Sequence, residues 1–352
     1  MKKIIATCTQ GSCVFLLSAL FICISCGNSK KATAETVDNT DSVIKAPEFN
    51  TDSAYAYTAA QCAFGPRVMN SEAHKQCGDY IVKKFKEFGA NVTEQETVIS
   101  PKTTEPTTED PSGKLPYKCR NIIASFDPQN PERVLICAHW DSRPWADNDP
   151  DKKNWHKPVM AANDGASGVA VMLEMARAIS RSKDPKLKVG IDFICLDAED
   201  AGTPQFSKQK DDESSWCLGS QYWAANPHVA GYTARYGILL DMVGGEGATF
   251  YQEGYSLQYA KDIVDRVWST AANLGYSSIF VNESGGYVTD DHGPINQTAN
   301  IPCIDIIPYS PNNPRSSFGD TWHTVNDTME HISKNTLKAV GETIMNVIYN
   351  EQ

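Results

Sequence analysis

Two apolar segments that each lead directly into a group of polar residues constrain the fold most. Residues 133–138 (RVLICA) lead into His139, and residues 189–196 (VGIDFICL) lead into 197–200 (DAED). A turn at 163–168 (NDGASG) lies between them and opens a segment with apolar residues at helical spacing. The order strand, helix, strand predicts a parallel crossover unit, in which loops at the carboxyl ends of strands are where sites form.

The same alternation of helical and extended patterns continues along the chain. Helices are expected at 50–64, 71–88, 219–225, 256–274 and 333–348, and further strands at 91–100, 119–126, 236–241 and 301–307. The polar segment 144–158 is long for a compact domain, which is typical of a loop that lines a cleft. The pattern as a whole predicts an α/β protein.

Size and charge limit the possible functions. The chain has 352 residues, 41% of them hydrophobic and 21% charged, so it can bury a sizeable core as one large domain or two. Its formal net charge is −11. Binding to nucleic acid requires a basic face, and the sequence shows none, so we expect no nucleic-acid partner.

The first residues have the composition of an export signal. Residues 1–26 contain Lys2, Lys3 and an apolar stretch that is short for a bilayer, and they end at Cys26. This end resembles a bacterial lipoprotein cleavage site, although Cys23 replaces the usual leucine. We expect a lipoprotein signal peptide at 1–26, a disordered tether at 27–48 and one catalytic domain at 49–352. The mature protein would be an exported lipoprotein, anchored by lipid to the membrane in the bacterial periplasm or at the outer membrane; a plain secreted or retained signal segment is the alternative.

The cysteines do not form an obvious disulfide framework. Seven lie beyond the expected signal, at positions 62, 77, 119, 137, 195, 217 and 303. Seven is an odd number, and three of the seven lie in apolar strand-like segments, where a thiol behaves as a small buried hydrophobe. We expect at most one or two disulfides; a cysteine-ligated zinc or a catalytic thiol is the alternative.

Residues at or near strand ends supply metal-ligand chemistry. The candidate ligands are His139, Asp164, Asp200, Asp241 and His323. Imidazole and carboxylate suit Zn²⁺, and three protein ligands with one open position is the catalytic arrangement.

Each candidate also has an ordinary structural interpretation. A lone Asp or His after a strand usually caps a turn, and Asp164 could be a helix N-cap. Glu199, beside a candidate ligand, could point the other way and act as a general base. The remaining histidines outside these motifs are interpreted as surface or capping residues: His74, His156, His228 and His331.

Taken together, six motifs resemble those of the zinc aminopeptidase superfamily and, within it, the bacterial glutaminyl cyclases. They are AHWDS at 138–142, NDGASG at 163–168, DAED at 197–200, LDMVG at 240–244, DDHGP at 290–294 and WHTVNDT at 322–328. The resemblance spans about residues 50–350 with the motifs in the family's order. It implies a three-layer αβα sandwich with a mixed, mostly parallel central sheet.

The resemblance also implies roles for individual residues. In the cyclases one zinc per chain is held by the residues that match Asp164, Asp200 and His323. The remaining matches are Glu199 as the catalytic acid/base, Asp241 and Asp290 as carboxylates in its hydrogen-bond network, and Trp322 as a wall of the substrate pocket. We also predict that Trp140 and Thr289 bind the substrate. In aminopeptidases, His139 and Asp241 would hold a second zinc, with Asp164 bridging the two ions. A core or rim position is the alternative for the tryptophans.

Three positions depart from the pattern. Asp200 stands where a glutamate ligand is usual, so the backbone must come closer or the ion must shift. Asp305 stands where animal cyclases have a histidine, and Thr289 stands where they have a glutamine.

Three functions are compatible with this inventory. A glutaminyl-peptide cyclotransferase would convert an N-terminal glutamine of a peptide or protein to pyroglutamate and release ammonia. A dinuclear zinc aminopeptidase would remove N-terminal residues, and a peptidase-like binding lipoprotein would do neither. The tryptophan beside His323 and the doubled aspartate at 290–291 favour the cyclase. We expect a monomer.

Overall fold

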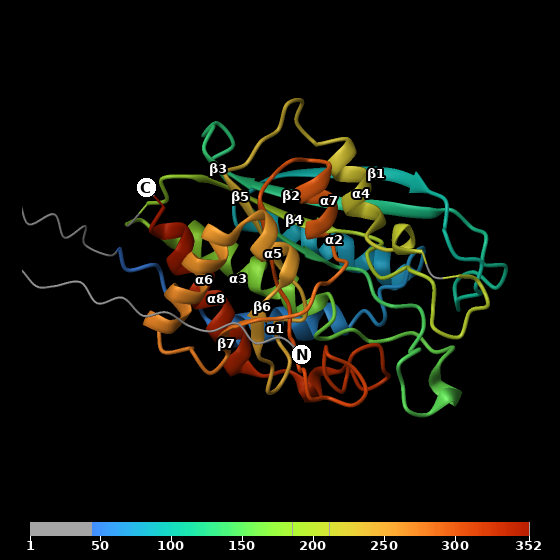
Figure 1. Ribbon diagram of the computed structural model, residues 1–352. Coiled ribbons are helices and arrows are strands. Elements are labelled where there is room, and N and C mark those ends of the chain that lie inside the picture. Colours follow the sequence, from blue (N-terminus) through green and yellow to red (C-terminus); the bar gives the residue numbers. More distant parts are fainter. Residues whose placement is uncertain (1–43, 185, 211, 352) are drawn as a thin grey trace, which may run out of the picture. The chain divides into compact units, whose positions relative to one another are not determined.

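A six-stranded mixed sheet forms the centre of the protein in the computed structural model (Figure 1). Its strands are β1 (Asn91–Ile99), β2 (Tyr117–Phe126), β3 (Arg133–His139), β4 (Gly190–Leu196), β5 (Tyr236–Leu240) and β8 (Cys303–Ile306). They lie in the order β1-β2-β4-β3-β5-β8; β4, β3, β5 and β8 run parallel, and β2 is antiparallel to both of its neighbours. The expected mixed sheet is confirmed. Two short strands, β6 (Phe250–Gln252) and β7 (Phe280–Ser284), pair separately.

Helices cover both faces of the sheet. They are α1 (Thr51–Cys62), α2 (Glu72–Glu87), α3 (Ala166–Arg181), α4 (Leu218–Ala225), α5 (Gly254–Tyr259), α6 (Lys261–Asn273), α7 (His292–Gln297) and α8 (Lys334–Tyr349). Short 3₁₀ turns lie at Lys152–Asn154, Glu213–Ser215 and Met329–His331. Asn50, Ser71 and Ser333 begin α1, α2 and α8 as N-caps, each accepting a backbone N–H three residues on.

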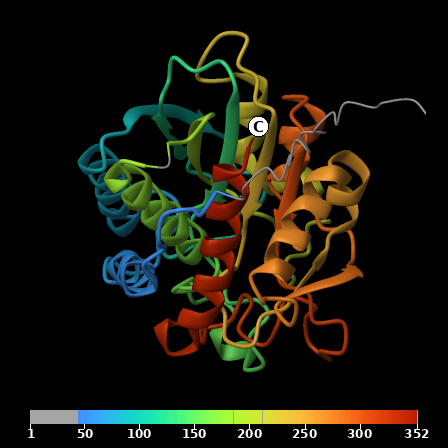
Figure 2. The ribbon, with the colours of Figure 1, turned by 90° about the vertical axis from the view of Figure 1, so that its left-hand side faces the viewer.

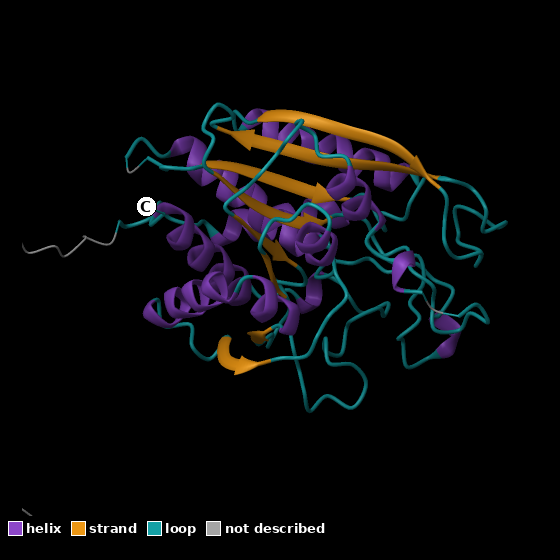
Figure 3. Ribbon diagram, turned by 45° about the horizontal axis from the view of Figure 1, so that its top comes forward, coloured by secondary structure: helices purple, strands orange, loops and turns teal. Residues whose placement is uncertain are grey.

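Alternation along the buried strands divides the core between two layers. On β3, Val134 and Ile136 pack into the cluster that contains α1, α2, α3, α6 and α8, whereas Leu135 and Cys137 pack into the cluster that contains α4 and α7. Figure 3 shows the helical layers on either side of the strands, and Figure 2 shows α8 between α3 and α6. The three-layer αβα sandwich expected from the resemblance is therefore confirmed.

The structure describes residues 44–184, 186–210 and 212–351. The expected signal peptide at 1–26 and most of the expected tether at 27–48 lie outside these residues. The last tether residues do not behave as a disordered segment, because the Ile44 N–H donates to Asn350 Oδ1 at 2.8 Å and Ala46 is buried in the core. The folded part therefore begins at least five residues before position 49. Within the described residues, no helix combines the length and apolarity needed to span a bilayer.

The helix expected at 256–274 is wrong as a single element. The structure has α5 and α6 instead, separated at Ala260, whose φ of −146° and ψ of 45° are not helical. Tertiary contacts fix the earlier helix independently: Glu253 caps α5 by accepting the N–H groups of Tyr255 and Ser256, and the Ser256 hydroxyl accepts the Asp305 N–H of β8. Helical periodicity carries no information about this attachment.

The crossover helix α3 lies unusually close to the sheet. A Cβ at Gly168 would lie 2.2 Å from the Leu240 carbonyl oxygen and 2.8 Å from the Ala138 Cβ. Glycine therefore sets the distance between this helix and β3 and β5, and with it the position of the 163–168 turn.

Replacing Gly168 with alanine should destabilise the fold by about 1–3 kcal/mol, the usual cost of overpacking a tight core. The free energy of unfolding from urea denaturation measures this. Gly293→Ala in α7 is the matched control, because a Cβ there meets no atom within 4 Å. Equal stability of the two variants would contradict the close approach of α3.

Candidate metal centre and active site

Parallel strands bring the polar residues of distant segments to one edge of the sheet. His139 ends β3, residues 197–200 follow β4, and Asp241 follows β5. Asp164 lies just before α3, and His323 lies in the long connection between β8 and α8. All five candidate metal ligands are buried within this edge.

The first ligand cluster consists of Asp164, Asp200 and His323. One ligand atom of each lies within 4.8 Å of the others. His323 Nε2 lies 3.1 Å from Asp200 Oδ1 and 3.6 Å from Asp164 Oδ2. The three side chains thus face a common point, as the sequence predicted.

The second cluster shares one residue with the first. His139 Nε2 lies 2.9 Å from Asp164 Oδ1 and 3.2 Å from Asp241 Oδ1, and the three ligand atoms lie within 4.8 Å of one another. Asp164 therefore turns one oxygen toward each cluster. This geometry has room for the arrangement in which Asp164 bridges two ions, as well as for a single ion in the first cluster.

Unpaired atoms show what the first cluster is built to hold. Asp164 Oδ2 and both carboxylate oxygens of Asp200 are buried without a hydrogen-bond partner. Such atoms are costly unless a cation or a donor compensates them. The surrounding carboxylates, Asp200 first among them, raise the pKa of His323 to about 9 although burial opposes this. A site that attracts a proton so strongly also attracts Zn²⁺, and two carboxylates with one imidazole are a suitable donor set.

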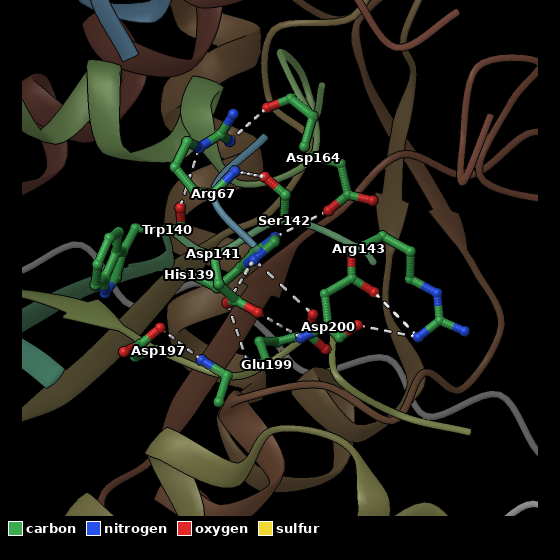
Figure 4. Close-up of polar contacts among 12 residues, drawn as sticks. Arg67, His139, Trp140, Asp141, Ser142, Arg143, Asp164, Asp197, Glu199 and Asp200 are labelled. Atoms are coloured by element: carbon green, nitrogen blue, oxygen red, sulfur yellow. Dashed lines mark hydrogen bonds and ion pairs between the residues drawn. The ribbon is translucent and has the colours of Figure 1, made fainter. Parts of the chain in front are cut away.

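Three further buried carboxylates hold the ligand segments in place. Asp141 accepts the N–H groups of Glu199 and Asp200 at 3.1 and 3.2 Å (Figure 4). Asp327 accepts those of Asn163 and Asp164 at 2.7 and 2.9 Å.

The third holds the histidine. Asp147 Oδ1 lies 3.5 Å from His323 Nδ1, which leaves Nε2 to face the cluster. Outer contacts of this kind fix ligand orientation before an ion binds.

Asp164 is not a helix cap, contrary to the structural alternative. The N-cap of α3 is Gly165, and no side chain caps this helix. Gly165 has a φ of +96°, and a Cβ there would lie 2.8 Å from the Asp141 carbonyl oxygen. Glycine at this position lets the turn approach β3 closely and frees the Asp164 carboxylate for the cluster.

The Glu199 side chain contacts other residues than the side chain of its neighbour Asp200 does. Its Oε1 lies 3.5 Å from the Cys217 thiol, and its Oε2 lies 3.9 Å from His139 Nδ1. Burial raises the pKa of Glu199 well above its usual range, with the charges of Asp200 and Asp290 adding to the effect and His139 opposing it. The left-handed φ of +53° at Ala198 turns the chain so that successive carboxylates face different partners.

A cavity of about 330 Å³ opens onto these groups. Its lining includes Asp164, Glu199, Asp200, Asp241, Thr289, Asp290, Trp322 and His323. The structure therefore brings the sequence-predicted residues of the site together, with the exception of Trp140. His139 contacts Asp164 and Asp241 but does not line the cavity. Aromatic residues that sequence reasoning left out of the pocket also line it, namely Trp216, Tyr287 and Phe318.

Trp140 does not line this cavity, so its assignment as a substrate-binding residue is wrong. Its ring is fully buried in the core, stacked on His74 at 4.1 Å between ring centroids. His74 was expected to be a surface or capping residue, and this expectation is wrong. Its ring is buried against Trp140, and its Nε2 lies 2.9 Å from Asp197 Oδ1. Both side chains of this pair lie behind the site and support the segment that follows β4.

None of the seven cysteines among the described residues forms a disulfide, which is within the expected limit of one or two. At the position of the animal histidine, Asp305 is buried with both carboxylate oxygens unpaired. His292 lies nearby from a different position, with Nε2 3.2 Å from Glu253 Oε2 and Nδ1 3.9 Å from Asp305 Oδ2. The position of His292 within the DDHGP motif was the sequence signal that could have identified it as a residue near the site.

The fold and the cation-binding cluster define a zinc-dependent enzyme with a peptidase-like α/β architecture. The chain belongs to Peptidase family M28, whose model matches residues 121–348. The superfamily expected from the sequence motifs is thus confirmed.

Known proteins similar to this chain carry two activities. The crystal structure of Bacteroides thetaiotaomicron glutaminyl cyclase bound to N-acetylhistamine is 51% identical, with a TM-score of 0.81 over 87% of this chain and 100% of that one. A leucine aminopeptidase precursor from Bacteroides thetaiotaomicron VPI-5482 is 50% identical, with a TM-score of 0.81 over 88% of this chain and 100% of that one. Aminopeptidase YwaD of Bacillus subtilis (strain 168) is 28% identical over 65% of this chain. The chain spans only 44% of the length of that curated relative.

Proposed function

We propose that this protein is a glutaminyl-peptide cyclotransferase that uses one zinc per chain. The proposal of a single zinc rests on which side-chain atoms of the two clusters lack a hydrogen-bond partner. Asp164 Oδ2 and the Asp200 oxygens accept no hydrogen bond, although Asp200 Oδ1 forms an ion pair with His323 Nε2 at 3.1 Å. In the second cluster, His139 and Asp241 are hydrogen-bonded to each other at 3.2 Å. This difference supports an ion in the first cluster and direct side-chain bonding in the second.

The reaction is an internal substitution and needs no water. The α-amine of an N-terminal glutamine attacks the γ-carbonyl carbon of the same side chain, a C–N bond forms, the γ-amide C–N bond breaks, and ammonia leaves. Zinc, when bound, supplies a Lewis acid for the carbonyl oxygen. The enzyme must also take a proton from the amine and deliver one to the departing nitrogen, which one carboxylate can do in turn.

Glu199 is suited to that proton transfer. It lines the cavity next to the ligand Asp200, and its environment favours the protonated form more than water does, so the carboxyl can both accept and return a proton. Asp290 lines the same cavity and has a ligand atom within 4.8 Å of the Glu199 carboxylate and the Cys217 thiol. We assign Asp241 and Asp290 to holding Glu199 and the substrate amine in place.

The aromatic walls supply the other requirement, a folded glutamine. Trp322 stacks on His323 with 3.8 Å between ring centroids, and the Trp216 ring lies parallel to the His323 ring within 6°, with 6.1 Å between their centroids. Flat, rigid walls near the ligands restrict a glutamine side chain to few rotamers. Such restriction lowers the barrier of an intramolecular reaction, because the reacting atoms are already close.

A dinuclear aminopeptidase is the second candidate. All five ligands of a two-ion site are present and Asp164 faces both clusters. Peptide hydrolysis requires an activated water, which two ions supply well. The similarity to the leucine aminopeptidase precursor and to YwaD supports this candidate.

Substrate assays separate the two candidates. The cyclotransferase should release ammonia from peptides that begin with glutamine and no free amino acid from peptides that begin with leucine. Coupled ammonia detection and mass spectrometry, which follows the loss of 17 Da on conversion of Gln to pyroglutamate, measure this. Release of leucine without ammonia would reject the proposal in favour of the aminopeptidase.

Glu199→Gln should lose turnover by at least about 10²-fold, the lower end of general acid/base contributions. Its zinc content should stay the same, because Glu199 is outside the first ligand cluster. The kinetics and metal content of the purified variant measure both. Glu246→Gln, at an exposed glutamate away from the cavity, is the control and should retain full activity. Full activity of the Glu199 variant would place the proton acceptor elsewhere.

The number of zinc ions tests the single-ion form directly. Mass-spectrometric metal analysis of the purified protein should give about one zinc per chain, because Asp164 and Asp200 of the first cluster have oxygens without hydrogen bonds, whereas His139 and Asp241 of the second are hydrogen-bonded to each other. His323→Ala should lose this ion and His139→Ala should retain it. Two ions per chain, reduced to one by His139→Ala, would indicate the dinuclear site instead.

A further inference from the structure

Arg143 is a fully buried cation beside the metal centre, and nothing in the proposed reaction uses it. Its side chain is about 1% exposed. It follows the AHWDS motif by one residue, and Figure 4 shows the guanidinium extending toward the segment that carries Asp200. A buried guanidinium must be fully paired to be tolerated, so its partners indicate its task.

The guanidinium joins three parts of the site. Its Nε and Nη2 donate to the two oxygens of Asp147 at 3.1 and 2.9 Å. Its Nη1 donates to the carbonyl oxygens of Asp200 and Gly202 at 3.0 and 2.9 Å. Asp147 in turn lies 3.5 Å from His323 Nδ1. One planar group therefore connects the backbone of one zinc ligand to the carboxylate that orients another.

The hydrogen bonds from Arg143 to the backbone hold the main chain at Asp200 in place, which matters because the aspartate side chain is short. A carboxylate on one methylene can meet an ion shared with Asp164 and His323 only if its main chain is held close. Arg143 holds the 200–202 backbone by both of these carbonyl groups. A lysine has a single ammonium without the fork geometry and cannot make the same set of bonds.

The guanidinium also supports the cavity wall. Arg143 Cζ lies 4.5 Å from the centre of the Trp216 ring, and this ring lies parallel to His323 within 6°. Gly202 leaves the space for the indole, because a Cβ there would lie 2.2 Å from it. Trp216 is thus held between Arg143, the Gly202 backbone and a metal ligand.

We propose that Arg143 is a positioning residue that fixes both the Asp200 ligand and the Trp216 wall. Arg143 would position the zinc ligands whether the protein is a cyclotransferase or an aminopeptidase. Only its effect on the binding of glutamine substrates rests on the proposed cyclotransferase function. Arg143 contacts backbone carbonyl groups, Asp147, the Trp216 ring and, through Nη1 at 3.7 Å, the Asp200 Oδ1 atom. It therefore acts through the ligand set and the cavity wall.

Arg143→Lys tests the proposal, because it keeps the charge and loses the planar fork. The zinc dissociation constant, measured by competition with a fluorescent chelator, should rise about 10–100-fold, as is usual for loss of an outer contact to a ligand. At saturating zinc, KM should rise several-fold with kcat nearly unchanged, because the wall is displaced while Glu199 is not. Unchanged zinc affinity in the folded variant would overturn the first part, and unchanged KM would overturn the second.

Arg133→Lys is the matched control. Arg133 is also a buried arginine that pairs through two nitrogens with one aspartate, Asp192, but at the start of β3 and far along the strand from the ligands. It should lose stability without a change in zinc affinity. A similar loss of zinc in both variants would show a general effect of destabilisation and overturn the assignment.

Arg143→Gln provides the same test if the lysine variant does not fold, since it leaves Asp147 in place and its single amide cannot reproduce the fork of the guanidinium. It should also weaken zinc binding, and wild-type affinity in this variant would count against the proposal. These readouts do not depend on which peptide is processed. A protein that releases leucine would reject the cyclotransferase and leave the zinc measurements valid.

Discussion

Buried carboxylate oxygens without hydrogen-bond partners are the constraint on which this structure depends. Asp164 and Asp200 carry such oxygens at the edge of the sheet, and each unpaired buried group costs on the order of 1–3 kcal/mol. A divalent cation offsets that cost, and parallel strands supply the geometry in which it can do so. The fold therefore holds several buried carboxylates together at one edge of the sheet, and a bound metal ion would offset their unfavourable interaction.

The surrounding residues keep this arrangement from relaxing. Asp141 and Asp327 hold the backbone of the ligand segments, and left-handed φ angles of +53° at Ala198 and +51° at His323 turn the chain where its side chains must face inward. Backbone strain of this kind persists only where tight packing imposes it. Packing of α3 on β3 and β5 through Gly168 provides that rigidity. The site is thus formed before substrate arrives.

The distinction between one ion and two rests on local bonding more than on the ligand inventory. The second cluster contains every residue that a second ion would need, yet His139 and Asp241 are bonded to each other. The single-ion proposal therefore follows from how these side chains pair.

The sequence by itself determined the order of the six strands of the main sheet, the α/β class and the positions of the ligands at or near strand ends, because apolar periodicity and polar residues at segment ends are local properties. Only the tertiary structure decided which aromatic rings line the cavity. Trp140, inside the AHWDS motif, turns into the core, whereas Trp216, outside all six motifs, lines the pocket. The direction of a side chain and the break at Ala260 depend on contacts between segments far apart in the chain, and a pattern within one segment carries no record of them.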